Sequence, residues 1–149
     1  MNYKVNEIKL SYQEKMGMSK MPAINSSKDA STLIFKHWDH GTIGVQESFK
    51  VLLLNNANKV KGIYQLSTGS MTGTLVDIRI LCAVIIKSLS VGVILTHNHP
   101  SGKLNPSEAD KQLTQKIKKA ASFFDVTVLD HLIIAPDGNY YSFADEGIL

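Results

Sequence analysis

The sequence contains very little cysteine. Cys82 is the only one in 149 residues, so an intramolecular disulfide is excluded, and so is every zinc site that needs several thiolates. Zinc nucleobase deaminases need a Pro-Cys-x-x-Cys pair, which excludes that class too. Cys82 falls on the apolar stripe of an expected helix, so we interpret it as a core residue and not as a reactive thiol.

Long hydrophobic runs are also missing. The longest apolar stretches, such as VLLLN and AVIIK, are too short to cross a bilayer. Residues 1–17 contain no continuous apolar region of the kind that a secretion signal needs. We therefore expect a cytoplasmic protein with no membrane partner.

The charge is close to balanced. A net charge of +3 and a pI near 8.9 allow a nucleic-acid partner without requiring one. Neither a glycine-rich phosphate loop nor a known DNA-binding motif is present, so nothing in the sequence supports base or phosphate recognition. The oligomeric state is not indicated by any pattern.

Helical and strand-like patterns alternate along the chain. Residues 1–24 are interpreted as an N-terminal extension and linker before one domain at 25–149. An edge strand is expected at Ile8, Leu10 and Tyr12. Strands are expected at SFKVLLLNN, KGIYQLST, VGVILTH, VTVLDHLIIAP and NYYSFA, with a hairpin around Asn55 to Asn58. Helices are expected from Ser27, over TGTLVDIRILCAVIIKSL and from Pro106 to Phe124. This order predicts a three-layer α/β/α sandwich with a mixed central sheet.

Three capping patterns predict where the helices begin. They are Ser27 as an N-cap, a capping box of Thr74 with Asp77, and Asn105 as an N-cap followed by Pro106 and Glu108. The predicted buried stripes are Ile78, Leu81, Cys82, Ile85 and Leu89 in the second helix, and Leu113, Ile117, Ala121 and Phe124 in the third. Lys111, Lys116, Lys118 and Lys119 occupy the rest of the third helix, as on a solvated face.

Two histidines stand one residue apart at the end of an apolar strand, in VGVILTHNHPSGKLNPSEAD. Residues i and i+2 of an extended segment project to the same side, so His97 and His99 present both rings to one point, while Asn98 faces away. Ser107 and Asp110 share one face of the next helix, and the short turn PSGKLN brings that face back to the histidines. Open α/β sheets place their sites at such strand ends.

Two imidazoles and a carboxylate that converge on one point form a three-ligand metal set. Catalytic zinc sites use three protein ligands and leave the fourth position to a water, whose pKa falls to about 7. We therefore predict that His97, His99 and Asp110 bind Zn²⁺, although iron and manganese also accept such ligands. The simpler alternative is that the histidines only hydrogen-bond a loop.

The spacing His97-x-His99, seven residues, Ser107, two residues, Asp110 resembles the JAMM motif of the MPN-domain metalloproteases. The strings HNHPSG, PSEAD and LDHLI resemble the RadC-like bacterial branch of that superfamily, over about residues 25–149. EIKLSY is similar to the opening of short RadC-like proteins without a helix-hairpin-helix region. The resemblance implies the MPN fold, whose architecture is similar to that of cytidine deaminases, and zinc-dependent hydrolysis of peptide or isopeptide bonds.

The resemblance also assigns roles to individual residues. It implies that Glu47, in QESFKVLLLN, is the general acid/base, and that Ser107 donates a hydrogen bond to the developing oxyanion. His131 matches the family string and is expected to support the site or the fold without binding metal. His37 and His40 are expected at a helix end or in solvent.

The resemblance leaves a second function open. A metal-stabilised, non-catalytic binding protein would keep the same ligands, and the RadC family carries an association with DNA repair. The substrate also stays open among peptides, isopeptides and small amides.

Overall fold

Five strands form one mixed sheet, in the order β2-β1-β3-β4-β5. They are β1 (Ser48–Leu54), β2 (Val60–Thr68), β3 (Gly92–Asn98), β4 (Thr127–Ile134) and β5 (Tyr140–Ser142). β3 and β4 are parallel, and the other neighbouring pairs are antiparallel. The structure, a computed structural model, describes residues 1, 4–9, 11–70 and 75–149.

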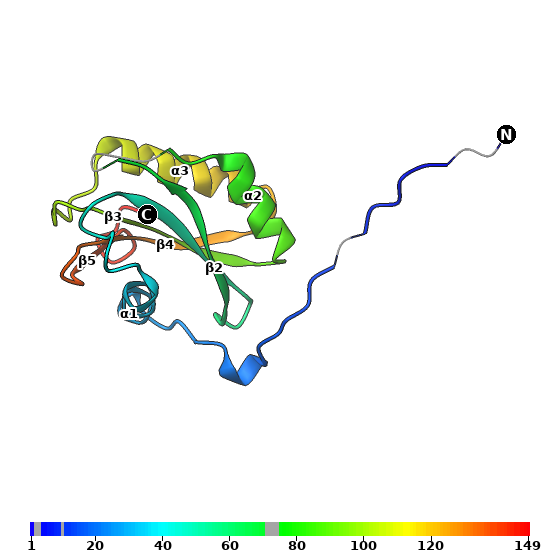
Figure 1. The fold of residues 1–149 in the computed structure, drawn as a ribbon, viewed down its shortest axis with the longest axis horizontal. Helices are drawn as coiled ribbons and strands as arrows, with labels where there is room; N and C mark the ends of the chain where they lie inside the picture. The colour runs from blue at the N-terminus through cyan, green and yellow to red at the C-terminus, as the bar shows by residue number, and fades with distance from the viewer. Residues whose placement is uncertain (2–3, 10, 71–74) are drawn as a thin grey trace.

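Helices cover both faces of the sheet. α1 (Ser27–His37) lies on one face, and α2 (Ile78–Lys87) and α3 (Glu108–Ser122) lie together on the other (Figure 1). A short 3₁₀ helix, η1 (Met18–Lys20), precedes α1. The predicted three-layer α/β/α sandwich with a mixed sheet is therefore confirmed.

The central strands divide their side chains between two cores. All residues of β1 and β3 are buried, and successive side chains of a strand point to opposite faces. Leu52 and Leu54 pack in the cluster that contains Ile34 of α1. Val51 and Leu53 belong to the opposite cluster, which also contains Leu81 and Ile85 of α2 and Ile117 and Ala121 of α3. Because helices cover both faces of the sheet, side chains on both sides of these strands are buried, and the strands contain continuous apolar runs in the sequence.

The predicted hairpin between β1 and β2 is confirmed. Asn55 closes it, because its Oδ1 atom accepts hydrogen bonds from the backbone N–H groups of Ala57 at 2.9 Å and Lys59 at 3.0 Å. Asn58 adopts a positive φ of 54°, which asparagine tolerates better than most residues. The turn chemistry thus fixes the register of the first two strands.

The first two helices begin at neighbouring caps and not at the predicted ones. The N-cap of α1 is Ser26, whose hydroxyl accepts from the backbone N–H of Asp29 at 3.1 Å, so the assignment of Ser27 was one residue late. The N-cap of α2 is Asp77, which accepts from Arg79 N. Thr74, its predicted capping partner, lies outside the described residues.

Two predicted core positions are wrong because their helices end early. Leu89 follows α2 with a φ of 52° and is 54% exposed, and Phe124 follows α3 and is 48% exposed. Helical periodicity no longer applies to either of them. The predicted edge strand at the N-terminus is also wrong: Ile8 and Tyr12 lie in no strand, and Leu10 is outside the described residues.

Across the described ranges, no helix is both long enough and apolar enough to span a bilayer.

Candidate metal centre

His97 and His99 lie at the end of β3, as their spacing predicts. His97 is the sixth residue of the strand and is fully buried, whereas the His99 side chain is partly exposed. The backbone N–H of His99 still bonds to Ile134 O of β4, so the strand geometry continues to this residue. The chain then turns, and Gly102 takes a φ of 80° that favours glycine.

Asp110 is held by the first turn of α3. The N-cap is Ser107, and its hydroxyl accepts from Asp110 N at 3.1 Å while Ser107 N donates to Asp110 Oδ2 at 2.8 Å. This reciprocal capping box corrects the prediction that used Asn105 as the N-cap and Glu108 as its partner. The box satisfies two backbone N–H groups at once, and it aims the Asp110 carboxylate.

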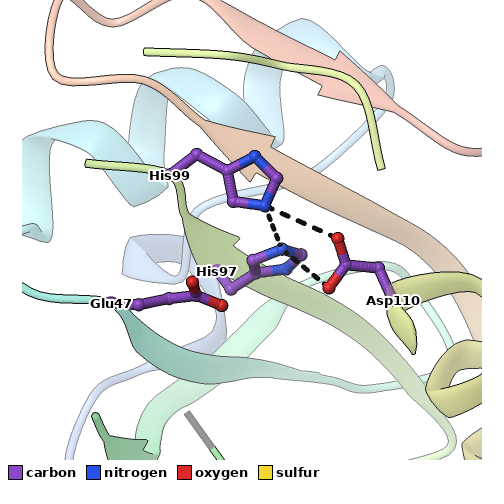
Figure 2. A group of neighbouring side chains, drawn as sticks. All are labelled: Glu47, His97, His99 and Asp110. Atoms are coloured by element: carbon purple, nitrogen blue, oxygen red, sulfur yellow. Dashed lines mark hydrogen bonds and ion pairs between the residues drawn. The ribbon is translucent and has the colours of Figure 1, made fainter. Parts of the chain in front are cut away.

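Three side chains converge on one point (Figure 2). The Nε2 atoms of His97 and His99 lie 3.0 Å apart, and they lie 3.4 Å and 3.5 Å from the two carboxylate oxygens of Asp110. His99 Nδ1 is 2.6 Å from the carbonyl oxygen of Lys103. A carbonyl can only accept, so Nδ1 carries the proton, and in the neutral ring the lone pair of Nε2 faces the cluster.

The electrostatics of this point favour a cation. Burial opposes ionisation of Asp110, but its contacts with His97 and His99 outweigh burial and hold the pKa of its carboxyl well below the usual range. Burial alone would lower the pKa of His99, and its contacts with Asp110 and Lys103 raise it instead. The lowered pKa of Asp110 favours its negative carboxylate, and the raised pKa of His99 shows that positive charge is favoured beside that carboxylate.

Glu47 completes the group from the other side. It precedes β1, and its backbone bonds to Ser70 O and Gly69 N hold it beside the end of β2. Its carboxylate faces His97, outside the dashed contacts that join the other three residues in Figure 2. Ligand atoms of all four residues lie within 4.8 Å of one another. Burial raises the pKa of the Glu47 carboxyl, against the influence of His97 and His99.

Ser107 lies beside the group without belonging to it. Its oxygen accepts the Asp110 backbone N–H, so the hydroxyl proton stays available for donation to another acceptor. The structure therefore places all five predicted site residues at one end of the sheet, with Ser107 as the cap of α3.

Asn98 supports the site in a way that the sequence did not indicate. Its side chain is fully buried and faces away from the histidines. Its Oδ1 accepts from Ser48 N at 2.7 Å, and its Nδ2 donates to Ile43 O and Gln46 O at 2.7 and 2.9 Å. These bonds tie the segment that carries Glu47 to the end of β3. The only sequence signal is an amide residue between the two histidines.

His131, which was expected to support the site or the fold, lies against His97, whereas Thr114 was not singled out from the sequence. The His131 ring is fully buried, and its Nε2 lies 2.8 Å from His97 Nδ1. Thr114 Oγ1 lies 2.6 Å from the other ring nitrogen of His131. Burial disfavours the charged form of His131 and lowers the pKa of its imidazole well below the usual value. His131 thus lies behind the His97 ring and does not reach the point where the group converges.

The remaining candidates lie elsewhere. His37 and His40 are exposed at and after the end of α1, as expected. Cys82 is half-buried on α2, so it is less enclosed than a core residue. Lys116 and Lys119 are exposed on α3, and Lys111 lies 3.4 Å from Glu108.

Comparisons with known proteins agree with this geometry. Residues 24–148 match the family model of the RadC-like JAB domain. The chain is 51% identical over 131 residues to a UPF0758 protein of Flavobacterium johnsoniae, an alignment that covers 87% of this chain and 55% of the relative. It is 47% identical over 104 residues to a UPF0758 protein of Porphyromonas gingivalis, covering 70% of this chain and 46% of the relative. The chain spans about half the length of these curated relatives. It belongs to the RadC-like JAB domain family, within the JAMM/MPN superfamily.

Proposed function

We propose that this protein is a zinc-dependent hydrolase of peptide or isopeptide bonds. One observation carries the proposal: two imidazole Nε2 atoms and a carboxylate meet within 3.5 Å of one another beside a further carboxylate. Electron pairs at these distances repel one another unless a cation lies among them. Two imidazoles and one carboxylate are a ligand set that zinc accepts, with room for a fourth ligand.

The residues divide into ligands and reacting groups. His97, His99 and Asp110 would hold the ion. A bound zinc would supply Lewis acidity, which lowers the pKa of water and polarises a carbonyl. Glu47 stands apart from the three ligands, and its pKa is raised by burial, which suits a general base. It would take a proton from the attacking water and deliver it to the leaving amine.

Ser107 is proposed to stabilise the developing oxyanion. Its hydroxyl uses a lone pair to cap α3, so its proton can point toward the carbonyl oxygen of the substrate. The domain responsible would be residues 25–149, with residues 1–24 as an extension. A peptide or protein is the proposed partner, and the cytoplasm is the proposed compartment, because one cysteine suits a reducing environment.

Glu47→Gln tests the proposal. Glutamine keeps the size of the side chain but cannot take a proton from water. We expect the variant to fold, to retain zinc at the wild-type stoichiometry, and to lose about 10²–10⁴-fold in the rate of cleavage of any substrate found in a peptide library. Zinc is measured by elemental analysis of the purified protein.

Two further variants serve as controls for Glu47→Gln. Asp110→Asn should lose zinc and activity together, because it removes a charged ligand. Glu108→Gln alters an exposed carboxylate in the same helical turn and should change neither. Release of zinc by Glu47→Gln would make Glu47 a ligand, and cleavage at the wild-type rate would show that it is not the base.

A further inference from the structure

A continuous chain of hydrogen bonds runs behind the candidate metal centre. The Thr114 hydroxyl donates to the backbone carbonyl of Asp110 at 2.7 Å, and its oxygen lies 2.6 Å from His131 Nδ1. His131 Nε2 lies 2.8 Å from His97 Nδ1. Thr114, His131 and His97 are all buried, so water does not compete for the two bonds that His131 makes.

The direction of every bond in this chain can be deduced. A carbonyl oxygen only accepts, so the one proton of the Thr114 hydroxyl goes to Asp110. The Thr114 oxygen must then accept from His131 Nδ1–H. An imidazole ring that carries its one proton on Nδ1 has an acceptor at Nε2, so His97 Nδ1 carries the proton of the next bond. The remaining nitrogen of His97, Nε2, is left with a bare lone pair.

The rings cannot readily turn away from this arrangement. His131 is stacked on Phe143 with ring centroids 4.5 Å apart, and it meets the edge of Phe49 at 5.5 Å. His97 is stacked against Phe49, with ring centroids 5.9 Å apart. A rotated ring would leave buried nitrogen atoms without hydrogen-bond partners, which is unfavourable.

We propose that Thr114 and His131 are positioning residues that set the tautomer of His97, so that its bare Nε2 atom faces Asp110 and His99. The effect of this tautomer on metal affinity rests on the proposed function, in which His97 is a metal ligand. The chain of bonds starts at the backbone carbonyl of Asp110, so the turn of α3 that aims the carboxylate also fixes the proton on His97.

Thr114→Val and Thr114→Ser form a matched pair that tests this role. Valine keeps the shape of threonine and loses the hydroxyl, whereas serine keeps the hydroxyl and loses the methyl group. In Thr114→Val, His131 Nδ1 loses its acceptor, which favours the other tautomer of His131 and moves the proton of His97 to Nε2. Loss of a hydrogen-bond partner behind a ligand typically weakens metal binding about 10–100-fold.

The readout is the zinc dissociation constant, measured by competition with a chromogenic chelator. We expect Thr114→Val to bind zinc about 10–100-fold more weakly than wild type, and Thr114→Ser to bind nearly as wild type does. A residue that only packs would give the reverse order, because serine leaves the larger void. His131→Gln, which offers an acceptor to His97 Nδ1, should bind more tightly than His131→Leu. The reverse order in either pair, or equal affinities, overturns the proposal.

Nitrogen-15 NMR of the imidazole rings gives a second readout that needs no metal. In metal-free protein at alkaline pH, His97 should carry its proton on Nδ1 in wild type and in Thr114→Ser, and on Nε2 in Thr114→Val. An unchanged tautomer in Thr114→Val overturns the inference. If wild-type protein binds no zinc, the proposed function fails, and the NMR spectra still decide whether Thr114 and His131 set the tautomer.

Discussion

Asn98 stands between the two histidines and turns away from them, yet it helps to hold the segment that carries Glu47. Its three hydrogen bonds reach Ile43, Gln46 and Ser48, which flank Glu47 in the chain. Glu47, the proposed general base, is therefore anchored to the same strand end that carries the two proposed histidine ligands. Loss of the Asn98 side chain would therefore loosen the contact between the segment that carries Glu47 and the strand end that carries His97 and His99.

We predict that Asn98→Ala costs stability as well as activity. The substitution leaves one backbone N–H and two carbonyl groups without their partner in a buried location, at about 1–3 kcal/mol for each unsatisfied group. Urea denaturation should show a lower free energy of unfolding. Ser101→Ala, in the exposed turn nearby, is the control and should change it by no more than about 0.5 kcal/mol. Equal unfolding curves for Asn98→Ala and wild type would remove Asn98 from this role.

The sequence predicts those site residues that lie within a few positions of one another in the same strand or helix. His97 and His99 are two apart in a strand, and Ser107 and Asp110 are three apart in a helix, so backbone geometry alone brings each pair together. The contacts of Asn98, Thr114 and His131 join residues 50, 17 and 34 apart. No local pattern encodes such contacts, because they depend on how the strands pair. Glu47 was identified only through the resemblance to a family.

Strands and helices differed in how well their limits could be predicted. β1 and β3 are buried over their whole length, and the apolar runs VLLL and VIL within them make both strands visible in the sequence. The start of α3 had two competing caps, Asn105 before Pro106 and Ser107 before Asp110. The structure selects Ser107, because only there do the side chain and the backbone cap each other reciprocally. A choice between adjacent caps depends on the contacts of the finished fold.

Strand β1 contains a lysine among its buried residues, and this predicts a pH effect. The Lys50 side chain is 8% exposed, with its Nζ 4.2 Å from the centre of the Trp38 ring. Burial lowers the pKa of its amine below the ordinary value of 10.5, and Asp39 opposes the shift. The folded state therefore binds fewer protons than the unfolded state between the lowered pKa and 10.5.

Replacement of Lys50 tests this directly. Between the lowered pKa and 10.5, the unfolding free energy of wild type should rise with pH relative to that of Lys50→Met, since the penalty for burying the charge disappears. The difference between the two proteins should level off at higher pH. Chemical denaturation from pH 7 to pH 11 measures it. A difference that stays constant with pH would mean that Lys50 titrates alike in both states.

The arrangement of the molecule as a whole explains why distant residues meet. β1 runs antiparallel to β3 with Phe49 opposite His97, so the residues just before β1 lie beside those just after β3. Glu47 and His99 are brought together in this way. β4 is parallel to β3 and reached through α3, which places His131 behind His97. The class of fold follows from the alternation of helices and strands, whereas this strand order does not.

The central claim is that His97, His99 and Asp110 bind a metal ion that stabilises the folded chain. Thermal unfolding of protein shown to be zinc-loaded, with and without a chelator, tests it most directly. Metal that binds only the folded state, at a hundredfold excess over its Kd, adds about 2.7 kcal/mol, or about 5–10 °C in Tm for a chain of this size. The chelator should remove that increment from wild type and from His40→Ala, which changes an exposed histidine outside the site. His99→Ala should melt at one temperature in both conditions. Equal melting of loaded and chelated wild-type protein would contradict the account.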